Sequence, residues 1–234
     1  MVTKYVLNEE NTMKYVFPVG SSHSRNLFCE ESFVCAEACD LKGDILRKYI
    51  PLGIEVLGAD HMGVDEMSMT RFIDHQKGVP TQNTTGGIYC CVMGEIDIRV
   101  NVGLASLADK DIEKTLEDLT NRYIAILPKA GSTLIIAVQP PLEEDLDVIA
   151  TNNYLYRWSD KKNAKEDPRG GWTKTMNHIL KDRCEKNNIT FFDPWSTYKL
   201  KNGFVDKKNG DGICHIKDTS RALEETLEFI LNNM

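Results

Sequence analysis

Five short, mainly apolar runs alternate along this chain with segments of helical spacing, and this alternation limits the fold more than any other feature. The runs are Lys14–Val19, Ile54–Leu57, Ile88–Met93, Thr133–Val138 and Ile189–Phe192. Their lengths suit β-strands, and a continuous apolar run is typical of a strand that is covered on both faces. Strands that alternate with helices form parallel sheets with right-handed crossovers. The sequence therefore predicts an α/β fold, a three-layer α/β/α sandwich with a five-stranded parallel sheet.

The clearest helical pattern lies between Asp109 and Leu127, where one apolar stripe recurs at three- and four-residue spacing and Pro128 ends it. Further helices are predicted within 24–39, 65–77, 172–183 and 223–231, the last capped by Asp218 or Thr219. Residues 142–168 are charged and irregular, which indicates a lid or rim over a site. All of these elements fit one domain over 1–234.

Composition limits the partners of the chain. Its 234 residues carry a net charge of -7 without a long basic run, which argues against nucleic acid or an anionic membrane as partner. No secretory signal and no membrane-spanning stretch is apparent, so we expect a cytoplasmic protein. The seven cysteines are scattered and odd in number, which predicts reduced core residues rather than a disulfide framework.

Polar residues follow the first strand at once. Gly20 allows a tight turn, and Ser22 and Ser24 come directly after it, with His23 between them. The carboxyl edge of a parallel sheet is where open α/β folds place their ligands, so Ser22 is a candidate nucleophile. The alternative is that Ser22 or Ser24 only caps a helix.

Two later segments support Ser22 as a candidate nucleophile. Gly94-Glu95-Ile96-Asp97-Ile98-Arg99 follows the third strand, and Asp211-Gly212-Ile213-Cys214-His215 precedes the last helix. A serine nucleophile needs a base and a carboxylate that orients this base. His215 is the candidate base and Asp211 its orienting carboxylate, although Asp211 also suits a simple turn.

The order of these motifs resembles that of the SGNH (GDSL-type) hydrolases, and the Gly-Glu-Ile-Asp-x-Arg string is similar to a poorly characterised branch of that family. The resemblance spans roughly residues 14 to 231 and implies a flavodoxin-like hydrolase fold with Ser22, Asp211 and His215 as catalytic residues. Ser24 then matches the last serine of the first family block, and Ser21 stands where aspartate is usual.

Two features depart from the common family pattern, and a third, the second-block glycine, has two candidates. Asp211 precedes His215 by four residues rather than three, and Asp97 replaces the asparagine of the oxyanion hole. An ionised carboxylate would repel the developing oxyanion, unless Arg99 pairs with Asp97 and backbone amides form the hole. Asp97 and Arg99 are therefore either a site pair or a structural ion pair. Gly58 and Gly63 are both candidates for the glycine of the hole.

The remaining candidates are weaker. A histidine next to a nucleophile points away from it, so His23 is expected to contact substrate or to be structural. Cys214 and His215 are residue types that bind metals. Neighbouring residues rarely ligate the same ion, however, and the sequence has no second Cys/His pair that would complete a site. We expect neither a metal nor a cofactor.

The sequence thus favours a serine esterase that acts on a small-molecule or glycan ester, with an O-acetyl group on a carbohydrate as the substrate implied by the resemblance. Two alternatives stay open. One is an acyl- or glycosyltransferase on the same scaffold, and the other is a non-catalytic glycan-binding relic of the fold. The oligomeric state, the acyl group and the acceptor are not determined by the sequence.

Overall fold

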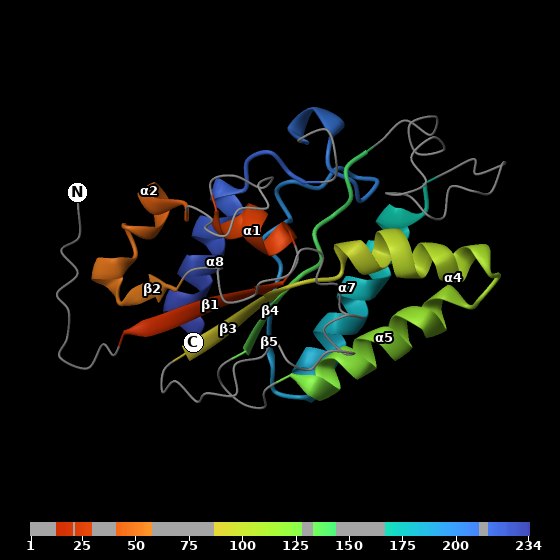
Figure 1. Ribbon diagram of the computed structural model, residues 1–234, viewed down its shortest axis with the longest axis horizontal. Helices are drawn as coiled ribbons and strands as arrows, with labels where there is room; N and C mark the ends of the chain where they lie inside the picture. Colours follow the sequence, from red (N-terminus) through yellow and green to blue (C-terminus); the bar gives the residue numbers. More distant parts are fainter. Residues whose placement is uncertain are drawn as a thin grey trace.

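The chain forms a five-stranded, wholly parallel sheet (Figure 1). The computed structural model describes residues 13–20, 22–29, 41–57, 87–127, 133–143, 167–210 and 215–234. The strands are β1 (Lys14–Gly20), β2 (Ile54–Val56), β3 (Gly87–Val92), β4 (Thr133–Ile136) and β5 (Thr190–Phe192), in the order β2-β1-β3-β4-β5. The predicted strand set and the predicted α/β/α class are confirmed.

Helices cover both faces of the sheet (Figure 1). On one face, α5 (Ile112–Ile126) and α7 (Arg169–Lys186) pack with the short α4 (Gly103–Leu107). On the other face lie α1 (Ser22–Phe28), α2 (Gly43–Leu46) and α8 (Ser220–Asn233). Each face has its own cluster of buried apolar side chains, and β1, β3 and β4 contribute to both, whereas the edge strand β2 contributes to one. This explains why the strands read as continuous apolar runs.

The two helices with the clearest sequence patterns form as expected. Helix α5 buries its stripe, and the side chain of Asp111 caps it by accepting a hydrogen bond from the Lys114 amide at 3.1 Å. At the start of α8, the Asp218 carboxylate accepts from the Ser220 amide at 2.9 Å. Thr219, the other predicted cap, uses its hydroxyl elsewhere, as described below.

Strand β4 ends at Ile136, two residues earlier than the apolar run predicts. The Ala137 amide still donates to the Phe192 carbonyl at 2.8 Å. At Val138 the ladder is replaced by a side chain, because Asn177 of α7 accepts from the Val138 amide at 2.7 Å and donates to its carbonyl at 3.0 Å. A side-chain amide can thus satisfy the hydrogen-bonding groups of a backbone that has no neighbouring strand.

The segment after β3 differs most from the sequence prediction. The sequence suggests a strand end with polar side chains, but the structure has a helical segment, η3 (Asp97–Val102), which continues into α4. A π-helical stretch of this kind is rare and often accompanies functional sites. A further 3₁₀ turn, η1 (Ile50–Leu52), precedes β2, and another, η5 (Lys207–Asn209), follows β5.

Four cysteines lie in the described part of the chain, and all four are buried thiols: Cys29, Cys90, Cys91 and Cys184. Burial raises the pKa of the Cys91 and Cys184 thiols to about 12, which leaves them protonated near neutral pH. The prediction of reduced core cysteines is confirmed for these four. Among the described helices, none has the length and apolar character that a membrane span requires.

Several predicted features lie outside the described residues. These are the helix at 65–77, most of the 142–168 segment, the glycines Gly58 and Gly63, and the Asp211 and Cys214 positions.

Candidate active site

The carboxyl ends of β1 and β3 lie side by side, and the candidate site is built on them. Gly20 pairs in register with Val92, the last residue of β3. A Cβ atom on Gly20 would lie 2.1 Å from the Val92 carbonyl oxygen, so only glycine fits here. The glycine that the sequence assigns to a tight turn is therefore required by the close approach of two backbones.

Helix α1 begins at Ser22, directly after this turn. The backbone of the candidate nucleophile thus lies at the carboxyl edge of the sheet. Its side chain and that of His23 are outside the described side chains. Ser24, two residues after Ser22 on α1, is buried, and its hydroxyl has no hydrogen-bond partner in the described structure.

His215, the candidate base, is buried just ahead of α8. The next residue, Ile216, forms an isolated antiparallel bridge with Gly210. Its carbonyl accepts a hydrogen bond of 3.0 Å from the side-chain amide of Asn26 on α1. Because Asn26 lies one helical turn after Ser22, this bond ties the segment that holds His215 to the helix that begins at Ser22.

A buried lysine strengthens the same connection. The ammonium group of Lys42 donates to the Asn26 carbonyl at 2.9 Å and to the Thr219 hydroxyl. The Thr219 hydroxyl in turn donates to the Asn26 carbonyl at 2.6 Å. We call Asn26, Lys42, Thr219 and the Ile216 carbonyl the α1–α8 junction. Asn26 and Lys42 are far from Ile216 and Thr219 in the sequence, so these bonds fix how α1 meets the segment before α8.

Asp97 and Arg99 lie on η3, and each has a different partner. Asp97 is fully buried and accepts a 2.8 Å hydrogen bond from the side-chain amide of Asn101. The Arg99 guanidinium forms two bonds with the Glu95 carboxylate, at 2.8 and 3.2 Å. Residues two apart on a helix do not face each other, whereas residues four apart do. The helical form of this segment therefore turns Asp97 and Arg99 towards different neighbours.

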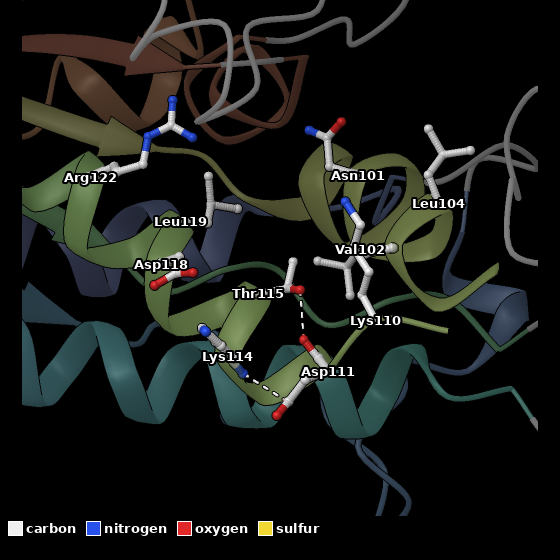
Figure 2. Close-up of a pocket in the computed structure, with 11 residues that line it drawn as sticks. Asn101, Val102, Leu104, Lys110, Asp111, Lys114, Thr115, Asp118, Leu119 and Arg122 are labelled. Carbon is white, nitrogen blue, oxygen red and sulfur yellow. Dashed lines mark hydrogen bonds between the residues drawn. The ribbon is translucent and has the colours of Figure 1, made fainter. Parts of the chain in front are cut away.

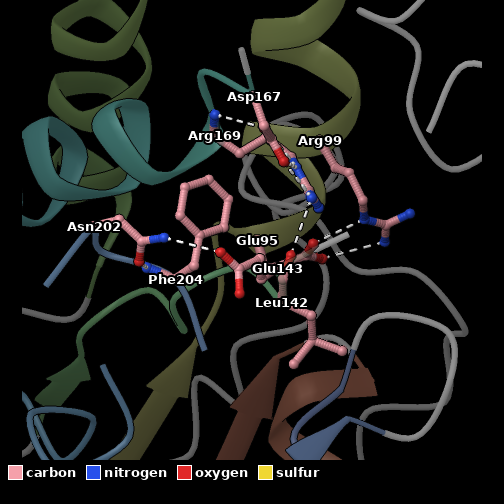
Figure 3. A network of polar contacts seen from close by, with 8 residues as sticks. All are labelled: Glu95, Arg99, Leu142, Glu143, Asp167, Arg169, Asn202 and Phe204. Atoms are coloured by element: carbon pink, nitrogen blue, oxygen red, sulfur yellow. Dashed lines mark hydrogen bonds and ion pairs between the residues drawn. The ribbon is translucent and has the colours of Figure 1, made fainter. Parts of the chain in front are cut away.

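A second buried ion pair lies beside the first (Figure 3). Arg169, at the start of α7, is 1% exposed and contacts both oxygens of the Asp167 carboxylate, the closest at 2.6 Å. The same guanidinium donates to the Leu142 carbonyl at 3.1 Å. Figure 3 shows the Arg169 and Glu95 side chains converging from α7 and from the segment after β3. Arg169 thus joins the start of α7 to the segment that follows β4.

A groove of about 570 Å³ runs between η3, α4 and α5 (Figure 2). Asn101 lines this groove and also holds Asp97, so the groove meets the candidate site through one side chain. Cationic and anionic side chains both line it, and Leu104 on its rim is 44% exposed. The described lining therefore favours no single sign of charge in a ligand.

The sequence missed several of the residues that build this site. Glu95 had a usable signal, because it precedes Arg99 by four residues within the Gly-Glu-Ile-Asp-x-Arg string. Asn26 and Lys42 had none, since the partners that tie them to the segment before α8 are distant in the chain, and the bond from Arg169 to the Leu142 carbonyl likewise spans 27 residues. Among the described residues, no three His, Cys, Asp or Glu side chains cluster as metal ligands would.

Comparison with protein-family models found no match, and no curated protein matches the chain. Solved structures do match along nearly the whole chain. One is a lipase/acylhydrolase from Enterococcus faecalis, at 10% identity and a TM-score of 0.54, with 94% of each chain covered. Another is a catalytic mutant of an acetylxylan esterase from Geobacillus stearothermophilus, at 11% identity and a TM-score of 0.55, with 97% of each chain covered.

A carbohydrate acetylesterase family member from Sinorhizobium meliloti is similar as well, at 12% identity and a TM-score of 0.50 over 94% of this chain and 100% of that chain. The chain has the fold of the SGNH hydrolases. Identities this low show the shared fold and leave the chemistry to be argued from the residues.

Proposed function

We propose that the chain is a serine esterase of the SGNH type that hydrolyses an acyl ester, with O-acetylated carbohydrate as its substrate class. The observation that supports this most is the hydrogen bond from Asn26 to the Ile216 carbonyl. It holds the start of α1, where Ser22 lies, against the segment of His215. The fold shared with an acetylxylan esterase supports the choice of substrate class.

In the proposed reaction, the Ser22 hydroxyl oxygen attacks the ester carbonyl while His215 takes its proton. The tetrahedral intermediate collapses, His215 passes the proton to the leaving alcohol, and the acyl group stays on Ser22. Water then attacks the acyl-enzyme with His215 again as base, which releases the acid and restores the serine. Asp211 would hold the imidazole in the required tautomer.

The oxyanion would be bound by backbone amides rather than by residue 97. An ionised carboxylate repels a developing negative charge, and Asp97 is fully buried and already bonded to Asn101. We assign the Ser22 amide and the amide of Gly58 or Gly63 to the oxyanion hole. Asp97 then acts indirectly, by fixing η3 through Asn101.

Active-site labelling tests this proposal directly. The wild-type protein is treated with a fluorophosphonate and digested, and the modified peptide is read by mass spectrometry. We expect one adduct, on Ser22, and none in the Ser22→Ala variant. Ser24→Ala is the matched control, since it removes a neighbouring hydroxyl and should leave the label in place. A label on any other residue, or no label, would exclude Ser22 as the nucleophile.

The non-catalytic alternative has one observation in its favour, the carboxylate of Asp97 at the position of the usual asparagine. A glycan-binding relic would bind acetylated sugars without hydrolysing them. Incubation with acetylated xylo-oligosaccharides separates the two functions, because hydrolysis releases acetate that an enzymatic assay measures. A transferase would instead transfer the acyl group to an added sugar acceptor, which mass spectrometry detects.

A further inference from the structure

A second pocket, of about 520 Å³, lies at the carboxyl end of β5. One wall comes from α7, which contributes Lys174, His178 and Lys181. Phe191 of β5 and Pro140 supply an apolar surface, and Phe192 borders the pocket. In the sheet order β2-β1-β3-β4-β5, this pocket is three strands away from β1. None of the candidate catalytic residues is among its described lining.

The pocket is cationic in a chain whose net charge is -7. Lys174, His178 and Lys181 are spaced four and three residues apart, so they share one face of α7. All three are exposed, and no carboxylate in the described parts of the chain forms an ion pair with Lys174 or Lys181. Asp193 is the one acid in the described lining, and its charge is already paired with Lys199 at 2.6 Å.

The walls of the pocket are held in place. Phe192 stacks on Phe229 of α8 with ring centroids 4.4 Å apart, and Phe191 packs against both apolar cores. Asn177, also in the lining, is fixed by its two hydrogen bonds to the Val138 backbone. A preformed pocket with apolar walls and a few polar groups on one side is the usual form of a small-molecule site.

We propose that this pocket binds a small phosphomonoester that carries a flat apolar group. Two unpaired ammonium groups on one helix face favour a dianion over a monoanion, and lysine binds phosphate as a compact point charge. The phenylalanine surface would take the apolar group while the phosphate contacts the α7 lysines. The volume lies within the range of about 300–1,000 Å³ that is common for small-molecule pockets.

Nuclear magnetic resonance titration of the full chain with phenyl phosphate tests this assignment, with inorganic phosphate and benzyl alcohol as the two half-ligands. We expect phenyl phosphate to shift the backbone amides of 174–181 and 191–193 and to bind more tightly than either half. The double variant Lys174→Ala/Lys181→Ala should weaken its binding at least tenfold. Phe191→Leu should weaken phenyl phosphate but leave inorganic phosphate unchanged.

The matched control is Lys110→Ala/Lys114→Ala, which removes the same charge from exposed lysines at the start of α5 and should change the affinity less than twofold. Equal losses in the two double variants would show that only the net charge matters and would overturn the site. Absence of binding would overturn it as well. Equal affinities for inorganic phosphate and phenyl phosphate would overturn the apolar part of the assignment.

Discussion

Charged side chains are arranged differently above the middle of this sheet and beside its edge strand β5. Above β1 and β3, the described charged side chains are buried and paired, as Arg99 is with Glu95 and Arg169 with Asp167. Beside β5, Lys174 and Lys181 are exposed and carry no ion pair. Buried pairs hold a backbone in one arrangement, since breaking them leaves an uncompensated charge. Exposed cations form at most weak ion pairs and remain available to a ligand.

The largest expected effect is on the rate of ester hydrolysis at the candidate site above β1 and β3. Ser22→Ala and His215→Ala should each lower the turnover of p-nitrophenyl acetate by about three or more orders of magnitude. The double variant should lose little more, because members of one catalytic unit are not additive. Steady-state kinetics measures both effects. If the losses of the two single variants multiply in the double variant, Ser22 and His215 act independently. They would then not form one catalytic unit.

The next effect is on stability and compares a buried ion pair with an exposed one. Arg169→Met should lower the free energy of unfolding by about 3–5 kcal/mol, because it leaves the Asp167 carboxylate, whose side chain is only 10% exposed, without its partner. Arg47→Met is the matched control: its pair with Asp44 is largely exposed and should contribute about 0–1 kcal/mol. Urea denaturation measures both. Similar losses of stability in the two variants would contradict the distinction between buried, paired charges and exposed ones.

A smaller effect is expected at the α1–α8 junction. Asn26→Ala removes the donor to the Ile216 carbonyl, and an unsatisfied buried acceptor costs about 1–3 kcal/mol. Since the junction positions His215, we expect kcat to fall about tenfold, which is the rate equivalent of about 1.4 kcal/mol, with little change in KM.

Thr226→Ala is the control for that variant, because it removes a buried hydrogen bond that stays within α8. It should reduce stability without reducing kcat. An Asn26→Ala protein that is destabilised but fully active would give the junction a structural role alone.

The smallest effect is expected at Asp97. The Asp97→Asn variant keeps the shape of the side chain, and its amide oxygen can still accept from Asn101. If backbone amides form the oxyanion hole, kcat/KM should change by less than about threefold, well below the loss of about 10²–10³ that follows removal of an oxyanion-hole donor. A loss of a hundredfold or more would make the Asp97 charge part of the chemistry.

Local patterns were enough for the fold. Strand runs such as Ile88–Met93 and the apolar stripe of α5 are predictable, because periodicity and run length depend only on residues that are close in the sequence. One error occurred where a long-range contact replaces a local one, and the other where a local helical contact replaces an extended strand end. Strand β4 stops at Ile136 because the Asn177 side chain takes over the Val138 backbone. The polar string after β3 was read as a strand end, and it forms η3, where helical spacing selects Glu95 as the partner of Arg99.

The sequence by itself determined the order of strands and helices, the glycine turn before Ser22 and the candidates for the catalytic residues. Only the tertiary structure decided what holds these candidates. Asn26 meets Ile216 across 190 residues of chain, and Lys42 meets Thr219 across 177. Only the tertiary structure, likewise, gathered the α7 lysines and the β5 phenylalanines around one pocket. Periodicity reports which face of an element is buried, but it carries no information about which distant side chain satisfies a buried polar group.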